Sequence, residues 1–249
     1  MARVAVVTGG GTGMGRAMAH ALAADGDTVV ILGRRANVLE QAAREISNSV
    51  PGPVRWRPCD VSQPGQVGDF VAWLLSEVSP TVDVLVNNAG GTGSIERGAT
   101  LEEAAAYAWR MLSANLVGAY LMTHALIPHL RRPGGRIVNI SSIAAFRGGG
   151  DMYSAAKAGL VGLSYSLAQE LGPDGITVNA IAPGLVLGTE FFGDRMTEER
   201  RQRTVSQTPM GRPGSPEDIA EAVRYLASPA ASFVTGEVLH INGGWIFGR

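Results

Sequence analysis

Short apolar runs rich in β-branched residues alternate with segments of helical periodicity along the whole chain. The runs that predict strands are Val4–Val7, Thr28–Leu32, Val54–Cys59, Val82–Val86, Arg136–Ile140, Thr177–Ile181 and Val238–Ile241. The segments that predict helices are Met14–Ala24, Asn37–Ile46, Gln66–Val78, Leu101–Leu130, Tyr153–Leu171 and Pro216–Ala227. Strands that alternate with helices form βαβ units, and near-continuous apolar strands are typical of a sheet covered on both faces. The sequence therefore predicts an α/β fold: a Rossmann-type, doubly wound parallel sheet of seven strands.

No linker, repeat or low-complexity stretch divides the chain, so residues 1–249 are expected to form one domain. Open α/β sheets reach this length as single units. The segment Thr189–Gly214 interrupts the alternation and contains the large apolar residues Phe191, Phe192 and Met196. Two interpretations stay open for it: a lid over a substrate pocket, or a segment whose aromatic side chains pack on the sheet edge.

Composition restricts the kind of partner. A hydrophobic fraction of 45% with 17% charged residues describes a compact globular protein, and a net charge of -1 lacks the basic surplus of a nucleic-acid binder. Only four apolar residues precede Thr8, too few for a secretory core or a membrane span. The single cysteine, Cys59, lies in an apolar run and suits a reducing compartment. We therefore expect a cytoplasmic protein that binds a small molecule, with no membrane and no nucleic acid as partner.

A glycine cluster follows the first predicted strand and opens the first predicted helix. Glycines allow a tight turn there and let a pyrophosphate approach the helix N-terminus, where free N–H groups favour negative charge. A strand-to-helix turn without a ligand would also use glycines, but the position after strand one favours a dinucleotide. The residues expected to contact it are Gly9, Gly11, Thr12, Gly13, Met14 and Gly15.

The end of the second strand indicates which dinucleotide is bound. An acidic side chain there binds the ribose 2′-OH of NAD(H), whereas arginine accommodates the 2′-phosphate of NADP(H). This strand ends in Leu32-Gly33 and is followed by Arg34 and Arg35, with no carboxylate. The sequence thus predicts NADP(H) as the preferred cofactor and leaves NAD(H) open. The two arginines could instead be solvated charges at a helix start.

Tyr153 and Lys157 lie one helical turn apart, on one face of a predicted helix. An ammonium ~5 Å from a phenol, at an effective dielectric of ~20, favours the phenolate by about 3 kcal/mol, or roughly two pKa units. Such a tyrosine could exchange a proton with a carbonyl or alcohol. Ser141 and Ser142 end the fifth predicted strand, at the edge where α/β sheets bind ligands, and a serine there can hold the substrate oxygen.

These motifs, in this order, resemble the short-chain dehydrogenase/reductase family over the whole chain, in particular its 3-oxoacyl-carrier-protein reductases. The cofactor turn is Thr8-Gly9-x-x-x-Gly13-x-Gly15, the fourth-strand motif is Asn87-Asn88-Ala89-Gly90, and the active-site motif is Tyr153-x-x-x-Lys157. Ser142 matches the family's catalytic serine, and Asn115 matches its helix asparagine.

The resemblance implies a role for each matching residue. Tyr153 would be the general acid or base, Lys157 would lower its pKa and hold the nicotinamide ribose, Ser142 would orient the carbonyl, and Asn115 would anchor a water in a proton relay. Asp60 would contact the adenine. The other implied cofactor contacts are Val61, Asn88, Ala89, Gly90, Pro183, Gly184, Val186 and Thr189. The family's usual homotetramer is implied as well, and no metal.

The chain departs from the family pattern twice. Ser142 precedes Tyr153 by 11 positions, so the loop Ile143–Met152 is shorter than usual, and Gly148 to Gly150 make it pliable. Ser141 therefore remains an alternative catalytic serine. The segment from Pro183 to Thr189 is one residue longer than usual, which makes Thr189 a weaker match than Val186 for the carboxamide contact.

The leading hypothesis is an NADP(H)-dependent oxidoreductase acting on a ketone or secondary alcohol, with a 3-oxoacyl compound as the favoured substrate. The alternatives are a non-catalytic NADP-sensing module and an NAD-dependent dehydrogenase of a sugar, a steroid or another small alcohol. Arg131 and Arg132 resemble the basic patch that meets a carrier protein, although cations at a helix C-terminus also suit the helix dipole. The substrate could thus be a free small molecule or a carrier-protein-bound acyl group.

Overall fold

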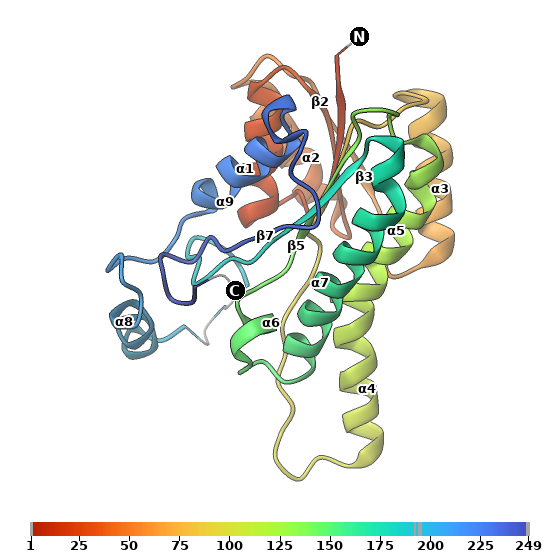
Figure 1. Ribbon diagram of the computed structural model, residues 1–249. Coiled ribbons are helices and arrows are strands. Elements are labelled where there is room, and N and C mark those ends of the chain that lie inside the picture. The colour runs from red at the N-terminus through yellow and green to blue at the C-terminus, as the bar shows by residue number, and fades with distance from the viewer. Residues whose placement is uncertain (1, 192, 194–195, 248–249) are drawn as a thin grey trace.

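A computed structural model describes residues 2–191, 193 and 196–247 of the chain, and its centre is one parallel β-sheet (Figure 1). The strand order is β3-β2-β1-β4-β5-β6-β7, and every neighbouring pair is parallel. This order forms a doubly wound parallel sheet of seven strands, the fold class predicted from the alternation of strands and helices. The strands are β1 Val4–Thr8, β2 Thr28–Gly33, β3 Val54–Pro58, β4 Val84–Asn87, β5 Arg136–Ile140, β6 Thr177–Ile181 and β7 Val238–Leu239.

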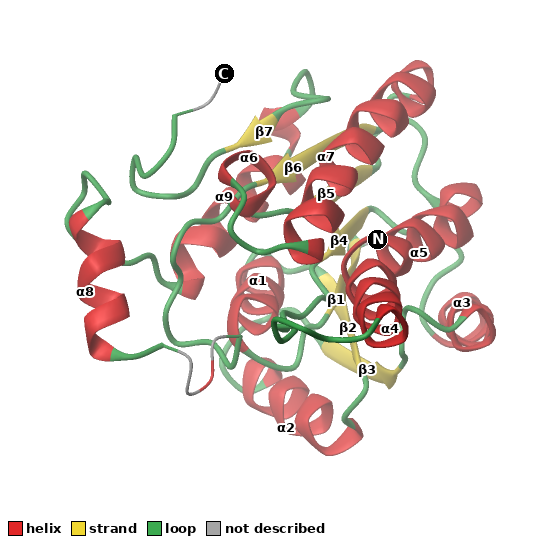
Figure 2. Cartoon of the chain, turned by 90° about the horizontal axis from the view of Figure 1, so that it is seen from below, coloured by secondary structure: helices red, strands yellow, loops and turns green. Residues whose placement is uncertain are grey.

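Helices cover both faces of the sheet, as Figure 2 shows from below: α1, α2 and α9 lie on one side, and α3, α5 and α7 on the other. Successive strand residues point to opposite faces, so Val29 and Ile31 enter one core cluster and Val30 and Leu32 the other. The helices are α1 Gly13–Ala24, α2 Ala36–Ser47, α3 Pro64–Glu77, α4 Leu101–Leu112, α5 Gly118–Leu126, α6 Ala144–Arg147, α7 Met152–Leu171, α8 Glu198–Ser206 and α9 Pro216–Ala227.

The helix predicted over Leu101–Leu130 is not uniform. A π-helical turn, Ser113–Val117, separates α4 from α5, and a 3₁₀ turn, Ile127–His129, follows α5. Periodicity does not reveal such a turn, because one extra residue changes the helical phase only locally. By length and composition this run could cross a membrane, with a mean hydropathy of 1.2, but core helices of water-soluble proteins pass the same test. Its α5 part buries Met122 and Leu126 against the sheet.

The loop predicted between Ser142 and Tyr153 is partly helical. Its first half forms the single turn α6, and the glycines that follow reverse the chain, with φ angles of 72° at Gly148 and 89° at Gly149. Asp151 also has a positive φ, 50°, and directly precedes α7. The glycines therefore end a helix rather than form a featureless loop.

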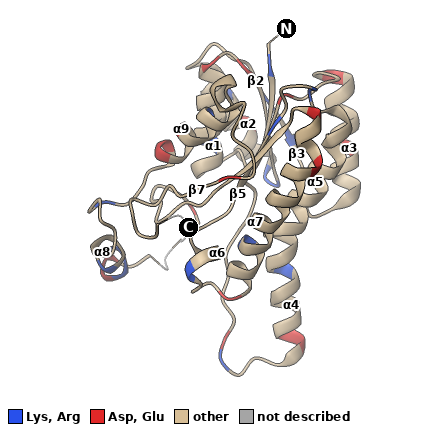
Figure 3. Cartoon of the chain, viewed as in Figure 1, with Lys and Arg blue, Asp and Glu red and all other residues tan. Residues whose placement is uncertain are grey.

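The segment Thr189–Gly214 leaves the sheet after β6 and carries α8, which buries none of its own residues and bears acidic and basic side chains (Figure 3). Its ends are tied together, because the Gly214 amide donates to Leu185 (2.8 Å) and the Leu187 amide donates to Gly214 (3.1 Å). Phe192 lies outside the described residues. Phe191 and Met196 are among the residues that line a cavity.

Candidate active site

A cavity of about 820 Å³ lies at the carboxyl ends of the first strands of the sheet. The glycine turn between β1 and α1 forms one wall, with positive φ angles at Gly9 (67°) and Gly13 (51°). A Cβ on Gly15 would lie 2.1 Å from the Gly9 carbonyl oxygen, so only glycine fits there. The turn thus brings bare backbone to the helix N-terminus, and the size and shape of the cavity suit a dinucleotide.

Most predicted cofactor residues border this cavity. Those that line it are Gly9, Gly11, Thr12, Gly13, Met14, Gly15, Arg34, Arg35, Asp60, Val61, Asn88, Ala89, Gly90, Tyr153, Lys157 and Thr189. The remaining three, Pro183, Gly184 and Val186, line a smaller adjoining cavity. Thr189 borders both cavities, whereas Val186 borders only the smaller one and is 5% exposed. This placement favours Thr189 over Val186 near a nicotinamide, the reverse of the order expected from the spacing.

Thr8 and Asn88 join the glycine turn to the end of β4. The Thr8 hydroxyl accepts from the Asn88 and Ala89 amides, each at 2.9 Å, and the Asn88 side chain donates to the Thr8 carbonyl at 2.9 Å. These bonds fix two strand ends relative to each other. They give the fourth-strand motif a structural role that its sequence pattern did not indicate.

Arg35, which precedes α2, forms an ion pair with Glu190 from the segment after β6, with 2.7 Å between the two side chains. Arg34 is exposed beside it, and no described residue forms an ion pair with it. Both arginines border the larger cavity, where a 2′-phosphate would meet them. The Glu190 contact was not expected, because nothing in the sequence relates position 35 to position 190.

Tyr153 and Lys157 project from the start of α7 toward the place where the cavities meet. The Lys157 ammonium lies 5.8 Å from the centroid of the Tyr153 ring and donates to the Ile140 carbonyl at 2.8 Å. Burial lowers the pKa of Lys157 to about 8. Burial raises the pKa of Tyr153 to about 12, and a hydrogen bond with Ser142 acts in the opposite direction. The expected lowering of the Tyr153 pKa by Lys157 is thus not found; desolvation of the phenol dominates instead.

The two serines at the end of β5 have different partners. The Ser141 hydroxyl donates to the Lys157 carbonyl at 2.8 Å and is buried, so it anchors α7 to the sheet. The Ser142 side chain accepts from the Ala144 amide at 3.1 Å, faces the smaller cavity and hydrogen-bonds with Tyr153. The geometry therefore brings Ser142, and not Ser141, to the reactive phenol.

Asn115 lies in the π-helical turn and is almost fully buried, at 1% exposure. Its side chain donates to the Met111 carbonyl at 3.0 Å and accepts from the Gly91 amide at 3.1 Å. A Cβ on Gly90 would lie 2.6 Å from the Asn115 oxygen and 3.4 Å from the Lys157 nitrogen, so both groups approach the same point. π turns occur frequently at functional sites, and this one points the asparagine toward Lys157.

The smaller cavity, about 180 Å³, lies between α6, the β6–α8 segment and the C-terminal segment. Phe191 covers Tyr153, with the ring centroids 5.6 Å apart. Two further residues at its rim were missed from the sequence: Arg147, at the end of α6, and Trp245, which is far away in the chain. The only sequence signal for Arg147 was its place in the short loop between Ser142 and Tyr153.

Comparison with known proteins agrees with this geometry. A family model described as Enoyl-(Acyl carrier protein) reductase matches residues 9–246. The chain is 42% identical over 251 residues to an acetoacetyl-CoA reductase of Rhizobium meliloti, covering 99% of this chain and 100% of that protein. It is 38% identical over 246 residues to a 3-oxoacyl-(acyl-carrier-protein) reductase of Aquifex aeolicus, covering 97% and 96%.

Solved structures show the same architecture. A short-chain type dehydrogenase/reductase from Mycobacterium ulcerans superimposes with a TM-score of 0.87 at 31% identity, covering 98% of this chain and 89% of that one. An actinorhodin polyketide ketoreductase variant with NADPH gives a TM-score of 0.86 at 33% identity, covering 98% and 97%. With the glycine turn and the Tyr153–Lys157 pair in place, the chain belongs to the short-chain dehydrogenase/reductase family of oxidoreductases, as its motifs predicted.

Proposed function

We propose that this chain is an NADP(H)-dependent oxidoreductase that interconverts a ketone and a secondary alcohol, with a 3-oxoacyl or related ketone as substrate. One observation carries the proposal: the dinucleotide-sized cavity and the smaller cavity meet at Tyr153. The residues that line both cavities are Met14, Thr92, Ser141, Tyr153, Thr189 and Phe191. A hydride donor in one cavity and a carbonyl in the other would meet beside the phenol.

In the direction of reduction, the chain supplies the proton. A reduced nicotinamide held by the residues of the larger cavity would supply a hydride for the carbonyl carbon. The Tyr153 phenol donates its proton to the carbonyl oxygen, while the Ser142 hydroxyl holds that oxygen by a hydrogen bond, and the alcohol results. The raised pKa of Tyr153 keeps the phenol protonated at neutral pH, as a proton donor must be.

Lys157 and Asn115 would return the proton to Tyr153. The pKa of Lys157, about 8, is near neutral pH, where an amine exchanges protons readily. Asn115 and Lys157 both approach Gly90, since a Cβ there would lie 2.6 Å from the Asn115 oxygen and 3.4 Å from the Lys157 nitrogen. This arrangement supports a relay from solvent through an asparagine-bound water to the lysine and then to the phenol.

Two observations support NADP(H) over NAD(H). Arg34 and Arg35 follow β2 where an NAD-binding protein would place a carboxylate, and a ketoreductase of the same fold was solved with NADPH. The related acetoacetyl-CoA and 3-oxoacyl-carrier-protein reductases support a 3-oxoacyl substrate, free or bound to a carrier protein.

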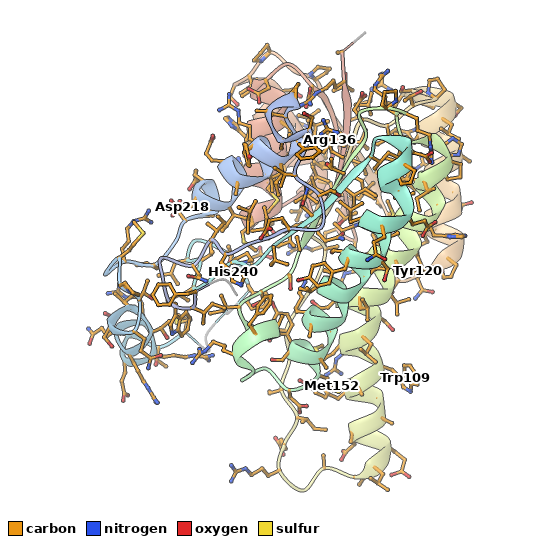
Figure 4. All side chains as sticks on the ribbon, in the orientation of Figure 1. Trp109, Tyr120, Arg136, Met152, Asp218 and His240 are labelled. Atoms are coloured by element: carbon orange, nitrogen blue, oxygen red, sulfur yellow. The ribbon has the colours of Figure 1, made fainter. Side chains whose placement is uncertain are left out.

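Further proposals concern the surroundings of the site. The tied ends of Thr189–Gly214 and the inward Phe191 support a lid function for that segment. Exposed apolar side chains support self-association into a homotetramer: Trp109 (68% exposed) projects outward from α4 (Figure 4), and Tyr120 (49%) lies on α5. The buried free thiol of Cys59 fits a cytoplasmic location.

The Tyr153→Phe variant tests the proposed function. It removes the phenolic proton but keeps the ring beside Phe191, so reduction of a 3-oxoacyl thioester, followed by NADPH absorbance, should fall at least about 100-fold. NADPH affinity, measured by fluorescence, should stay within about twofold. Tyr165→Phe, an exposed tyrosine on the same helix, serves as the control. Retained turnover in Tyr153→Phe would refute the assigned chemistry.

A further inference from the structure

The smaller cavity contains one charged side chain among the residues that the structure describes, and this is Arg147. The rest of the described lining is apolar or carries neutral polar groups such as Ser142 and Thr204. No described carboxylate forms an ion pair with Arg147. A cation at the edge of a substrate cavity, with no counter-charge among the described residues, is suited to meeting an anion on the ligand.

The guanidinium is held in place by an aromatic ring. Its central carbon lies 4.3 Å from the centroid of the Trp245 ring. Trp245 in turn donates from its indole nitrogen to the Gln207 side chain at 3.2 Å, just after α8. A guanidinium stacked on an indole face keeps its in-plane N–H groups free, and these groups can bind a carboxylate or phosphate in a bidentate manner.

Arg147 shares a cavity with the groups that are proposed to react. Ser142 lies two residues before α6, accepts from the Ala144 amide, and lines the same cavity of about 180 Å³. From Ile143 to Arg147 the chain advances about 6 Å along the helix axis. The cavity is smaller than those that hold drug-sized ligands, so the group reduced there is short.

We propose that Arg147 binds an anionic group of the substrate, so that the substrate is a short oxo compound carrying a carboxylate or a phosphate. This inference rests on the proposed ketone reduction at Tyr153. The anion has two sources: the carboxylate of a free 3-oxo acid, or a phosphate of the carrier to which a 3-oxoacyl group is bound as a thioester. Trp245 acts as a positioning residue, because its ring holds the guanidinium of Arg147.

Four 3-oxobutanoyl compounds separate these cases. Acetoacetate carries a carboxylate, ethyl acetoacetate is its neutral ester, acetoacetyl-CoA carries phosphates, and acetoacetyl-N-acetylcysteamine is a neutral thioester. Arg147→Gln should raise KM for the relevant anionic compound about 10- to 100-fold, as expected for loss of a charge-assisted hydrogen bond, with kcat within about threefold. The neutral compounds should show kcat/KM values within about threefold of wild type. Arg147→Lys should restore part of the affinity.

Arg55→Gln is the matched control, because Arg55 is an exposed arginine on β3 that donates only to the Glu77 carbonyl in the described chain. A KM effect confined to acetoacetate identifies a carboxylate, and one confined to acetoacetyl-CoA identifies a phosphate. Equal losses on neutral and anionic compounds would overturn the proposal and leave Arg147 a packing role. Unchanged kinetics with all four compounds would overturn it as well.

A binding measurement keeps this inference separate from the proposed function. Calorimetric titration of 3-hydroxybutyrate and of coenzyme A into wild type and Arg147→Gln reports anion binding without turnover. One outcome is that wild type reduces no carbonyl compound but binds one of these anions, and that Arg147→Gln abolishes this binding. The anion site would then be supported, and the proposed reaction would be refuted. If neither anion binds wild type, the anion site is refuted whatever the turnover.

Discussion

The Arg35 guanidinium and the Glu190 carboxylate lie 2.7 Å apart and connect the end of β2 to the segment after β6. Both side chains are more than half exposed, at 57% and 65%, so the pair contributes little to stability. Both also line the larger cavity. A phosphate that binds Arg35 at that place must displace the Glu190 carboxylate, and cofactor binding would thereby release the first residues of the proposed lid.

We therefore expect Glu190→Gln to bind NADPH roughly two- to fivefold more tightly, because the carboxylate no longer competes for Arg35. Affinity for NADH, which lacks the 2′-phosphate, should be unchanged. Fluorescence titration with both cofactors measures the ratio of NADPH affinity to NADH affinity. Glu199→Gln on α8 removes an equal charge from the same segment and should leave the ratio at its wild-type value. An equal gain for NADH would show that the effect is general electrostatics.

The buried Lys157 makes stability depend on pH in a defined direction. Its pKa is about 8 in the folded chain, below the 10.5 of an ordinary lysine, so between these values the unfolded chain binds the extra proton and stability rises with pH. From pH 7 to 9.5, the free energy of unfolding of wild type should rise by about 2 kcal/mol relative to that of Lys157→Met. The variant also lacks the hydrogen bond to Ile140, which changes its unfolding free energy by the same amount at every pH. Urea unfolding of both proteins across this range gives the difference, and a flat difference would refute the lowered pKa.

The two serines at the end of β5 should separate stability from catalysis. Ser142→Ala removes the hydroxyl that bonds to Tyr153, and kcat should fall on the order of 100-fold with little change in the unfolding free energy. Ser141→Ala breaks the bond to the Lys157 carbonyl and should cost about 1 kcal/mol while keeping most of the activity. Steady-state kinetics and urea unfolding of both variants provide the test. A large loss of kcat in Ser141→Ala, with activity retained in Ser142→Ala, would make Ser141 the catalytic serine.

Gly15 and Gly68 should respond in opposite ways to alanine. A Cβ on Gly15 would meet the Gly9 carbonyl oxygen at 2.1 Å, so Gly15→Ala should destabilise the fold by about 3 kcal/mol and open the cofactor turn. Gly68 lies inside α3 with no atom near its added Cβ, so Gly68→Ala should stabilise the chain by about 0.5 to 1 kcal/mol. Thermal unfolding distinguishes the two. If Gly15→Ala leaves the stability unchanged, the glycine turn can shift to make room for the added Cβ.

The fold and the central motifs could be predicted because they depend on local regularities. Period-two and period-3.6 patterns identify strands and helices, and Tyr153 and Lys157 are neighbours in any helix. Parallel strands place their carboxyl ends at one edge, which brought Ser142 and Asn88 to the same site. None of these inferences required knowledge of distant contacts.

The features that escaped prediction depend on contacts between distant segments. Arg147 meets Trp245, and Arg35 meets Glu190, and no periodicity connects such pairs. The sign of the Tyr153 pKa shift also depends on three-dimensional burial, since a Coulomb argument from the Tyr153–Lys157 spacing leaves desolvation out. The choice between Ser141 and Ser142 required knowing which side chain already had a partner on α7.

The π-helical turn at Ser113–Val117 holds about one residue more than an α-helical turn, so the extra residue is absorbed locally and α4 and α5 keep their phases on either side of it. Removing one residue from this turn would restore a regular α-helix and leave Met122 and Leu126 on the sheet, but it would close the widened turn that presents Asn115 to Lys157. The turn thus separates the placement of the asparagine from the packing of α5, so an engineered variant could change one and keep the other.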